Sequence, residues 1–340
     1  MDRPLVLLDP APQRRETIFA AATWRALHER FRVVEVDSST PEGAATFDLL
    51  LPEAFAVVGQ PDLTTERLQR ATALRAVCNV EGNFLPNVDY ATCQDRGVYV
   101  LNCGPAYAQA VAEYSLGLAL DLARGITRED RAFREGRERY TSGANQDAVL
   151  LRHADVGFVG FGNLGRALLP LLRPFAPRIR VYDPWLPDSA LREADVEPAG
   201  LEQVLSESTF VFVLATVTEE SEHLLDGKRL DLLRPAARLV LVSRAAVVDF
   251  PALYERVATG RFLAAVDVWP EEPVAPDDPA RRLEGMLLSA HRAGGIEAAF
   301  HTIGEMVVDD LSQVAAGLPP VRMQVAAREL VQRYRNRPVS

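Results

Sequence analysis

The chain is poor in cysteine. Cys78, Cys93 and Cys103 are the three cysteines in 340 residues, and none of them forms a CxxC pair with another. An odd number of scattered cysteines argues against a disulfide framework or a cysteine metal site and favours buried thiols in a reducing compartment. We therefore expect a cytoplasmic protein that holds no metal.

Long hydrophobic runs and an excess of positive charge are also missing. The N-terminal "LVLLD" ends at Asp9-Pro10, which is too short for a signal peptide. The most apolar stretch, which starts at Ala106, carries Glu113 and Asp121 and predicts a buried helix rather than a membrane span. The net charge of -10 argues against nucleic acid or an anionic membrane as a partner. A small molecule is the expected partner.

Two series of short apolar runs alternate with helical stretches. The strands predicted in the first hundred residues are "LVLLD", "RVVEVD", "AFAVVG", "LRAVCNV" and "GVYVLNC", with helices at 14–31 and 64–73 among them. Those predicted in the second series are "VGFVGF", "RIRVYD", "TFVFVLA", "RLVLVS", "FLAAVDV" and "GMLLSA". The alternation predicts an α/β fold with two parallel sheets. The apolar helix from 106 joins the series, and a helix at 296–317 leads back, so the second domain is inserted into the first.

A glycine fingerprint opens the second series. In "GFVGFGNLGRALL", Gly160 permits a tight turn, Gly162 permits the backbone to approach a pyrophosphate, and Gly165 permits close packing of helix and strand. The pyrophosphate would lie at the helix N-terminus, where Asn163 and Leu164 stand. Glycines in an ordinary turn are the alternative, but the strand before and the helix after favour a dinucleotide site.

Asp183 ends the next predicted strand, at the position that selects the cofactor. Its carboxylate would accept hydrogen bonds from the adenosine ribose hydroxyls and repel a 2′-phosphate. Neither Pro184 nor Trp185 adds a compensating cation. The sequence therefore predicts NAD rather than NADP, although an aspartate before proline also commonly begins a turn.

Three further candidate residues stand at the ends of later strands. Arg244 offers a fork for a carboxylate, His291 exchanges protons near neutral pH, and Glu272 would favour the imidazolium form of a nearby histidine. Taken singly, each has an ordinary explanation as a surface ion pair, a packed histidine or a solvated acid. Their order behind a dinucleotide fingerprint indicates a redox site.

Nearly the whole chain resembles the D-isomer-specific 2-hydroxyacid dehydrogenase family. The resemblance rests on "VYVLN", "AVAEYSLGLALDLAR", "GFVGFGNLGR" with Asp183, "TVTEES", "LVSRAAVVD", "AVDVWPEEP" and "SAHRAGG". It implies a Rossmann NAD-binding domain at 105–292, inserted into a flavodoxin-like substrate domain at 1–104 and 293–340. It also implies an NAD-dependent dehydrogenase that transfers a hydride between NAD(H) and a 2-oxo acid or D-2-hydroxy acid, and a homodimer.

The same resemblance implies residue roles. Arg244 matches the arginine that binds the substrate carboxylate, His291 the acid/base, and Glu272 the carboxylate paired with it. Asp267 and Ser243 match positions on the nicotinamide side, and Thr216 lies in the cofactor-lining loop. Gly82, Asn83 and Phe84 match the loop whose N–H groups hold the substrate carboxylate.

Several departures concern the substrate end. Ala245 replaces the family's usual glycine, Gly104-Pro105 inverts the usual Pro-Gly, Tyr107 stands where asparagine is common, and Arg292 stands where an aliphatic residue is usual. Arg292 and Tyr107 suggest a polar or anionic second group on the substrate.

Two alternatives stay open at this point. The fold family includes corepressors, so an NAD-binding interaction protein is one. Formate and phosphite enzymes are the other, but they carry glutamine at the position of Glu272 or a lysine in the "EGNF" loop, and this sequence has neither.

Overall fold

The computed structural model describes residues 3–141 and 145–331. The chain divides into two compact units: Met1–Tyr107 with Gly295–Ser340, and Ala108–Gly294. The predicted boundaries fall after residues 104 and 292, close to these. The roles predicted for the two units stay predictions at this point.

The first unit is built on a six-stranded sheet in the order β13-β5-β4-β3-β1-β2. All neighbours are parallel except β13 and β5, and the order β2-β1-β3-β4-β5 is that of flavodoxin-like folds. Its elements are β1 (Leu5–Asp9), α1 (Arg15–Ile18), α2 (Ala21–Arg30), β2 (Arg32–Glu35), α3 (Pro41–Leu50), η1 (Leu51–Glu53), β3 (Ala54–Gly59), α4 (Thr65–Arg70), β4 (Ala76–Asn79), α5 (Tyr90–Asp95), β5 (Tyr99–Asn102), α13 (Glu297–Ala315), β13 (Gln324–Val325) and α14 (Arg328–Val331).

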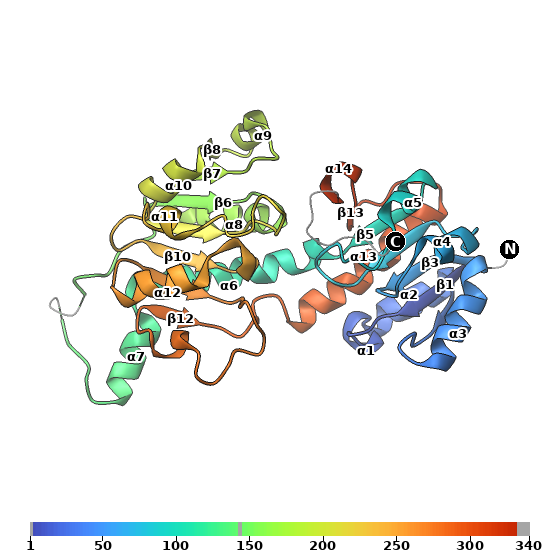
Figure 1. The fold of residues 1–340 in the computed structure, drawn as a ribbon, viewed down its shortest axis with the longest axis horizontal. Coiled ribbons are helices and arrows are strands. Elements are labelled where there is room, and N and C mark those ends of the chain that lie inside the picture. Colours follow the sequence, from blue (N-terminus) through green and yellow to red (C-terminus); the bar gives the residue numbers. More distant parts are fainter. Residues whose placement is uncertain (1–2, 142–144, 332–340) are drawn as a thin grey trace. The chain divides into compact units, whose positions relative to one another are not determined.

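Alternating side chains of these strands form a separate core on each face of the sheet. Leu5 and Leu7 of β1 pack with α3, α4 and α5, whereas Val6 and Leu8 pack with α1, α2 and α13. Both faces are therefore covered by helices, as Figure 1 shows for this unit. A parallel sheet buried on both faces explains why its strands read as continuous apolar runs.

The second unit is built on a seven-stranded parallel sheet in the order β12-β11-β10-β9-β6-β7-β8. Counted from β6, this is the Rossmann order 3-2-1-4-5-6 with one more strand. Its elements are β6 (Asp155–Val159), α8 (Asn163–Leu172), η3 (Arg173–Phe175), β7 (Arg178–Tyr182), α9 (Asp188–Glu193), β8 (Glu197–Pro198), α10 (Leu201–Glu207), β9 (Phe210–Val213), α11 (Gly227–Leu230), β10 (Arg238–Leu241), η4 (Ala245–Val247), α12 (Phe250–Ala258), β11 (Leu263–Val266), η5 (Pro279–Arg282) and β12 (Met286–Leu288).

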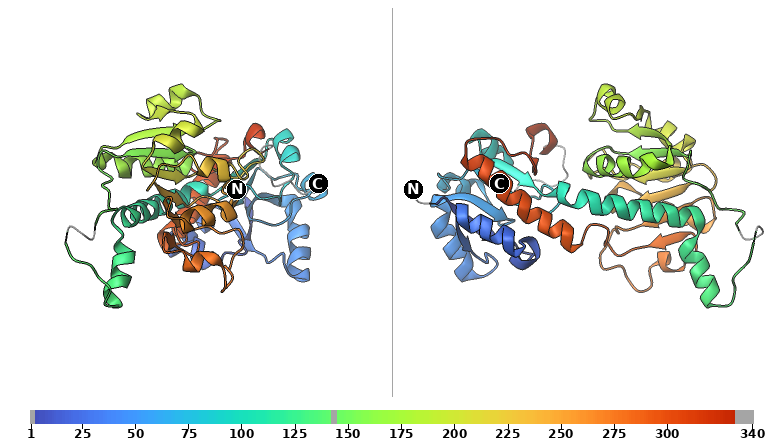
Figure 2. Two further views of the ribbon diagram at one scale, coloured as in Figure 1. Left: turned by 60° about the vertical axis from the view of Figure 1, so that its left-hand side comes forward. Right: turned by 180° about the vertical axis from the view of Figure 1, so that it is seen from behind.

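Two helices precede this sheet in the chain. α6 (Gly104–Arg124) begins in the first unit and lies along one face of the second sheet, while α10, α11 and α12 cover the other face (Figure 2). α7 (Ile126–Arg134) follows and contains no buried residue. No helix in the described part of the chain has the length and apolar character needed to cross a membrane.

Most predicted elements are confirmed, with one clear difference. The helix predicted at 14–31 is two helices, α1 and α2, separated by Phe19 and Ala20 in extended conformation. α13 passes so close at Gly304 that an added Cβ would lie 2.5 Å from the carbonyl oxygen of Ile18. α13 therefore packs directly against the break, and this contact between distant parts of the chain has no trace in the local pattern.

Candidate active site

The glycine fingerprint lies in the turn between β6 and α8. Gly160 has φ +96°, and a Cβ there would lie 2.8 Å from the backbone of Ala215 after β9. A Cβ on Gly165 would lie 3.0 Å from the Phe161 ring. At Gly162, by contrast, a Cβ would meet no described atom within 4 Å. The first and third glycines are therefore required by packing, and the second leaves open space beside the backbone.

The first turn of α8 suits an anion. Gly162 is its N-cap, no side chain caps it, and no acidic residue stands in the turn that Asn163, Leu164 and Gly165 begin. Backbone N–H groups and the helix dipole thus face the open space at Gly162. Pro170 stands inside this helix, which ends two residues later, at Leu172, and passes into η3.

Asp183 lies directly beside the glycine turn. Its Oδ2 accepts a hydrogen bond from the N–H of Phe161 at 2.8 Å, and its Oδ1 accepts from the N–H groups of Trp185 and Leu186 at 2.9 and 3.2 Å. The carboxylate therefore both starts a turn and adjoins the fingerprint. Oδ2 keeps one acceptor position for a further donor, and none of the ion pairs in the described part of the chain includes Asp183.

Thr216 and Ser243 follow β9 and β10 on the same edge of the sheet. The carbonyl of Thr216 accepts a hydrogen bond from Ser221 Oγ at 2.7 Å, which closes the loop after β9. Ser243 is buried, and its Oγ has no hydrogen-bond partner among the described residues. A buried hydroxyl without a partner is costly, so this atom is suited to bond a ligand.

Arg244 is half-buried at the end of β10. Its Nη1 donates to the carbonyl of Ser243 at 2.7 Å, which holds the guanidinium near the strand end. Ala245, in place of the family's glycine, begins η4 and is absent from the residues with positive φ. The substitution is therefore accommodated without backbone strain.

His291 and Glu272 form the predicted pair. Nδ1 of His291 lies 2.8 Å from Oε2 of Glu272, and the two side chains are 49% and 37% exposed. An ionised carboxylate only accepts, so Nδ1 carries the hydrogen. Nε2 makes no hydrogen bond within the described residues. The ring is therefore oriented by the bond at Nδ1, and Nε2 is left for a substrate.

Asp267 holds the loop that carries His291. Its carboxylate is buried and accepts hydrogen bonds from Ser289 Oγ at 2.5 Å, from the N–H of Arg292 at 2.9 Å and from the N–H of Ala293 at 3.1 Å. Its carbonyl accepts from the N–H of His291 at 2.7 Å. Arg292 thus enters the site through its backbone, while its side chain is exposed.

Tyr114 of α6 joins this network and was missed from the sequence. Its hydroxyl lies 2.7 Å from Ser289 Oγ. Because the Ser289 hydroxyl donates its one hydrogen to Asp267, Tyr114 must be the donor to Ser289. No motif connects positions 114 and 289, so only the structure reveals the contact.

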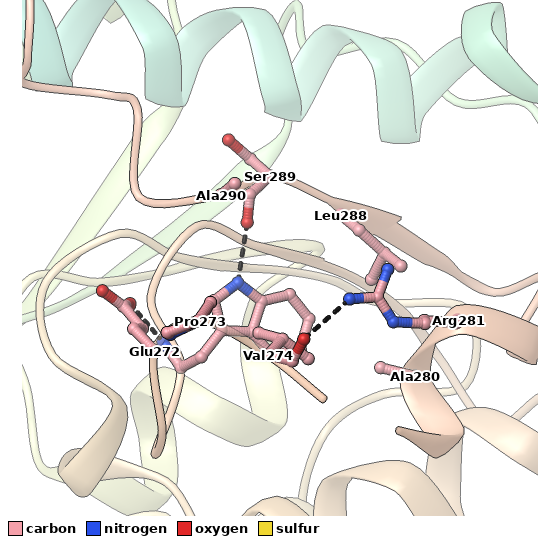
Figure 3. A pocket seen from close by; sticks show the side chains of 9 residues that line it. Glu272, Pro273, Val274, Ala280, Arg281, Leu288, Ser289 and Ala290 are labelled. Carbon is pink, nitrogen blue, oxygen red and sulfur yellow. Dashed lines mark hydrogen bonds between the residues drawn. The ribbon is translucent and has the colours of Figure 1, made fainter. Parts of the chain in front are cut away.

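Trp269 connects the two loops of the pair. Its backbone N–H donates to Glu272 Oε1 at 3.0 Å, and its indole Nε1 donates to the carbonyl of Ser289 at 2.7 Å. Figure 3 shows both bonds beside a pocket that Glu272, Pro273, Val274, Arg281 and Leu288 help to line. Neither Arg244 nor His291 is among the residues that line this pocket.

The loop Gly82–Phe84 lies in the first unit, after β4. Among the described residues, no acceptor is bonded to the N–H groups of Gly82 and Asn83. The Phe84 side chain is buried in the core and packs edge-on against Tyr90, so it anchors the loop. This leaves the N–H groups of Gly82 and Asn83, rather than the Phe84 ring, available for a ligand.

The Tyr107 ring packs against the same loop at Gly82. A Cβ on Gly82 would lie 3.3 Å from its ring, which also stacks edge-on with Phe300 of α13. Its hydroxyl is hydrogen-bonded to Cys103, and burial raises the pKa of the phenol. Tyr107 therefore packs against the loop, and the inverted Gly104-Pro105 stands at the start of α6.

These observations fit a dinucleotide. The open space at Gly162, the uncapped turn of α8 and the unpartnered Ser243 hydroxyl lie at the carboxyl ends of β6 and β10, where doubly wound sheets bind ligands. Arg244, Glu272 and His291 follow β10, β11 and β12, which are neighbours in the sheet. Within the described residues, no group of histidine, cysteine, aspartate or glutamate side chains is arranged to hold a metal.

Several known proteins are similar to this chain in sequence or in fold. Residues 116–293 match the family described as D-isomer specific 2-hydroxyacid dehydrogenase, NAD binding domain. A glyoxylate reductase of Korarchaeum cryptofilum is 31% identical over 76% of this chain and 78% of its own length. A hydroxypyruvate reductase of Thermotoga maritima is 28% identical over 77% and 85%. The crystal structure of a phosphoglycerate oxidoreductase from Rhizobium etli is 44% identical, with a TM-score of 0.87 over 96% of this chain and 99% of that one.

The geometry of the second unit and the family match both indicate an NAD-binding domain. A Rossmann unit fitted for a dinucleotide carries an oriented histidine–glutamate pair, and the family match covers that unit. The chain therefore belongs to the D-isomer specific 2-hydroxyacid dehydrogenase family and is an NAD-dependent oxidoreductase of 2-oxo and 2-hydroxy acids.

Proposed function

We propose that Arg244, Glu272 and His291 are the residues that carry this reaction. The observation that supports the proposal most strongly is the 2.8 Å contact of His291 Nδ1 with Glu272, which leaves Nε2 to face a substrate. During reduction, charge grows on the keto oxygen as the keto carbon is reduced. Nε2 of the imidazolium delivers the proton to that oxygen, and Glu272 stabilises the charged ring.

Arg244 binds the substrate carboxylate and stabilises the developing oxyanion. In the first unit, the N–H groups of Gly82 and Asn83, together with that of Phe84, are the groups proposed to bind a carboxylate of the substrate. The first unit is accordingly the substrate domain and the second the NAD domain. When bound, NADH supplies the hydride that reduces the keto carbon.

The proposed cofactor site consists of residues on the carboxyl edge of the second sheet. Gly160, Gly162 and Gly165, with Asn163 and Leu164, accommodate the pyrophosphate. Thr216, Ser243 and Asp267 face the nicotinamide half, and Arg244 and His291 border it. Asp183 binds the ribose through the free position of Oδ2. It excludes a 2′-phosphate because none of the described arginines or lysines forms an ion pair with it.

Two further properties belong to this proposal. A homodimer is supported by α7, which buries nothing and leaves Ile126 and Phe133 exposed. A cytoplasmic location is supported by the three free, buried cysteines. Burial raises the pKa of each thiol, and that of Cys93 reaches about 12, so all three stay protonated at neutral pH.

A steady-state assay tests the proposed function. The protein should oxidise NADH with glyoxylate, pyruvate or hydroxypyruvate and form the D-product where a stereocentre arises. Its kcat/KM with NADH should exceed that with NADPH. Equal or better efficiency with NADPH would refute the role of Asp183, and the absence of turnover with every 2-oxo acid would favour a non-catalytic NAD-binding protein.

A further inference from the structure

The first unit has a switch point of its own. The strand order β4-β3-β1-β2 reverses the direction of chain progression between β1 and β3. Ligands of open α/β sheets bind at the carboxyl ends of the strands at such a point. The loops that follow β1, β3 and β4 meet there.

Side-chain amides tie these three loops together. Gln60, after β3, donates through Nε2 to the carbonyl of Ala11 at 2.9 Å and accepts from the N–H of Val80 at 2.8 Å. Gln13, after β1, donates through Nε2 to Oε1 of Glu81 at 3.2 Å. The position of the Glu81 carboxylate is therefore set by a loop that is distant in sequence.

Glu81 has unused capacity as an acceptor. The side chain is half-buried, and Gln13 is its one hydrogen-bond partner within residues 3–141 and 145–331, so Oε2 accepts none there. No ion pair between described residues includes Glu81. It directly precedes Gly82 and Asn83, whose N–H groups are unbonded among the described residues.

The neighbouring polar groups are directed elsewhere. Asp9, at the end of β1, is buried and accepts a hydrogen bond from Ser38. The hydroxyl of Tyr107 bonds to Cys103. Since none of the ion pairs between described residues neutralises the Glu81 carboxylate, it would repel a negative group placed beside it.

We propose that Glu81, held by Gln13, is a specificity-determining residue that accepts a hydrogen bond from a hydroxyl on the carbon next to the keto group of the substrate. The proposal rests on the proposed function of the Gly82–Phe84 loop. It selects 3-hydroxy-2-oxo acids and disfavours substrates whose second group is a phosphate or a carboxylate. A carboxylate that accepts a hydrogen bond from the substrate hydroxyl raises kcat/KM for hydroxylated substrates. The same carboxylate repels a substrate phosphate or carboxylate and lowers kcat/KM for those substrates.

The test compares kcat/KM with NADH for four probes: hydroxypyruvate, pyruvate, phosphohydroxypyruvate and oxaloacetate. The wild type should favour hydroxypyruvate over pyruvate by about 10- to 100-fold, the worth of one hydrogen bond to a charged group. Glu81→Ala should remove this preference and leave pyruvate reduction within about twofold. Glu81→Gln, which keeps an acceptor but no charge, should retain part of the preference and improve the use of oxaloacetate.

Two controls separate the effects. Glu53→Ala removes an exposed carboxylate at the opposite edge of the same sheet and should change no ratio. Gln13→Ala should lower the hydroxypyruvate preference less than Glu81→Ala does. Unchanged ratios in Glu81→Ala, or a wild type that prefers phosphohydroxypyruvate or oxaloacetate, would overturn the proposal while pyruvate turnover still supported the proposed function. Failure of all four probes would instead overturn both.

Discussion

At the scale of single residues, the reactive pair depends on where the backbone places His291. The residue has φ +51°, a conformation that a non-glycine residue adopts only under constraint. Its N–H is bound by the carbonyl of Asp267, and its ring is bound by Glu272. These two hydrogen bonds fix the imidazole and leave Nε2 without a partner among the described residues. The unusual backbone conformation thus goes with a fixed orientation of the ring.

Glu272→Gln tests how the pair handles charge. An amide supports the imidazolium less than a carboxylate 2.8 Å away does, so the ring should deliver its proton more slowly. The kcat of reduction should therefore fall about tenfold, with the unfolding midpoint unchanged. The measurement is kcat with NADH beside thermal unfolding, with Glu271→Gln, an exposed neighbour, as the control. A kcat equal to that of the wild type would refute the pairing.

The fingerprint glycines allow a matched pair of substitutions. Gly162→Ala places a methyl group in open space, so the fold should be kept while the KM for NADH rises about tenfold or more. Gly160→Ala forces a Cβ against the backbone of Ala215 at φ +96° and should cost about 1–3 kcal/mol of stability. Thermal unfolding and NADH titration distinguish the two. If Gly162→Ala binds NADH as tightly as the wild type, the proposal that the pyrophosphate binds at this turn is refuted.

At the scale of elements, the parallel strands bring the chemistry together. Arg244, Glu272 and His291 are far apart in sequence but follow three neighbouring strands, β10, β11 and β12. Apolar runs in the sequence mark these strands well because both faces are buried. The short helices α5, α9 and α11 were not predicted, since few residues define their periodicity. α3, which has 10 residues, was not predicted either.

The candidate site was predictable where a motif carries it. The glycines, Asp183 and the histidine–glutamate pair stand at family positions, and the structure places them at one edge of the sheet. Tyr114 and the unpartnered hydroxyl of Ser243 were not foreseen as such, because hydrogen-bond partners depend on three-dimensional packing. For Tyr107, the sequence suggested a substrate contact, and the structure shows packing against Gly82.

Tyr114→Phe tests whether α6 positions the His291 loop. The change deletes the hydroxyl that donates to Ser289 and keeps the ring. Loss of one hydrogen bond predicts a fall in kcat of about fivefold, with the NADH dissociation constant and the pH profile retained. Tyr254→Phe, which removes a hydroxyl that donates to Asp278 away from the His291 loop, is the control. If kcat stays at the wild-type value, the network does not position the loop.

At the scale of the whole molecule, α7 stands out because none of its residues is buried against the rest of the described chain. Ile126 and Phe133 on this helix are 59% and 63% exposed, and Tyr140 beyond it is 70% exposed. Exposed apolar side chains gathered on one segment mark an interaction surface. A second copy of the chain is the partner that the proposed homodimer supplies.

Sedimentation velocity at micromolar concentration tests this assembly. The species should have twice the chain mass of 37.4 kDa. Phe133→Glu should shift it toward the monomer because the charge would be buried in the contact. Leu318→Glu, which alters an exposed leucine after α13, should leave the dimer intact. A wild-type monomer would contradict the proposal.

The central claim is that His291 delivers the proton during reduction of a 2-oxo acid by NADH. It is tested most directly by kcat of His291→Ala with a substrate that the wild type reduces, measured beside NADH binding by fluorescence. We predict a loss of about 10²- to 10⁴-fold in kcat, with NADH binding largely retained. A His291→Ala protein as active as the wild type would contradict the account.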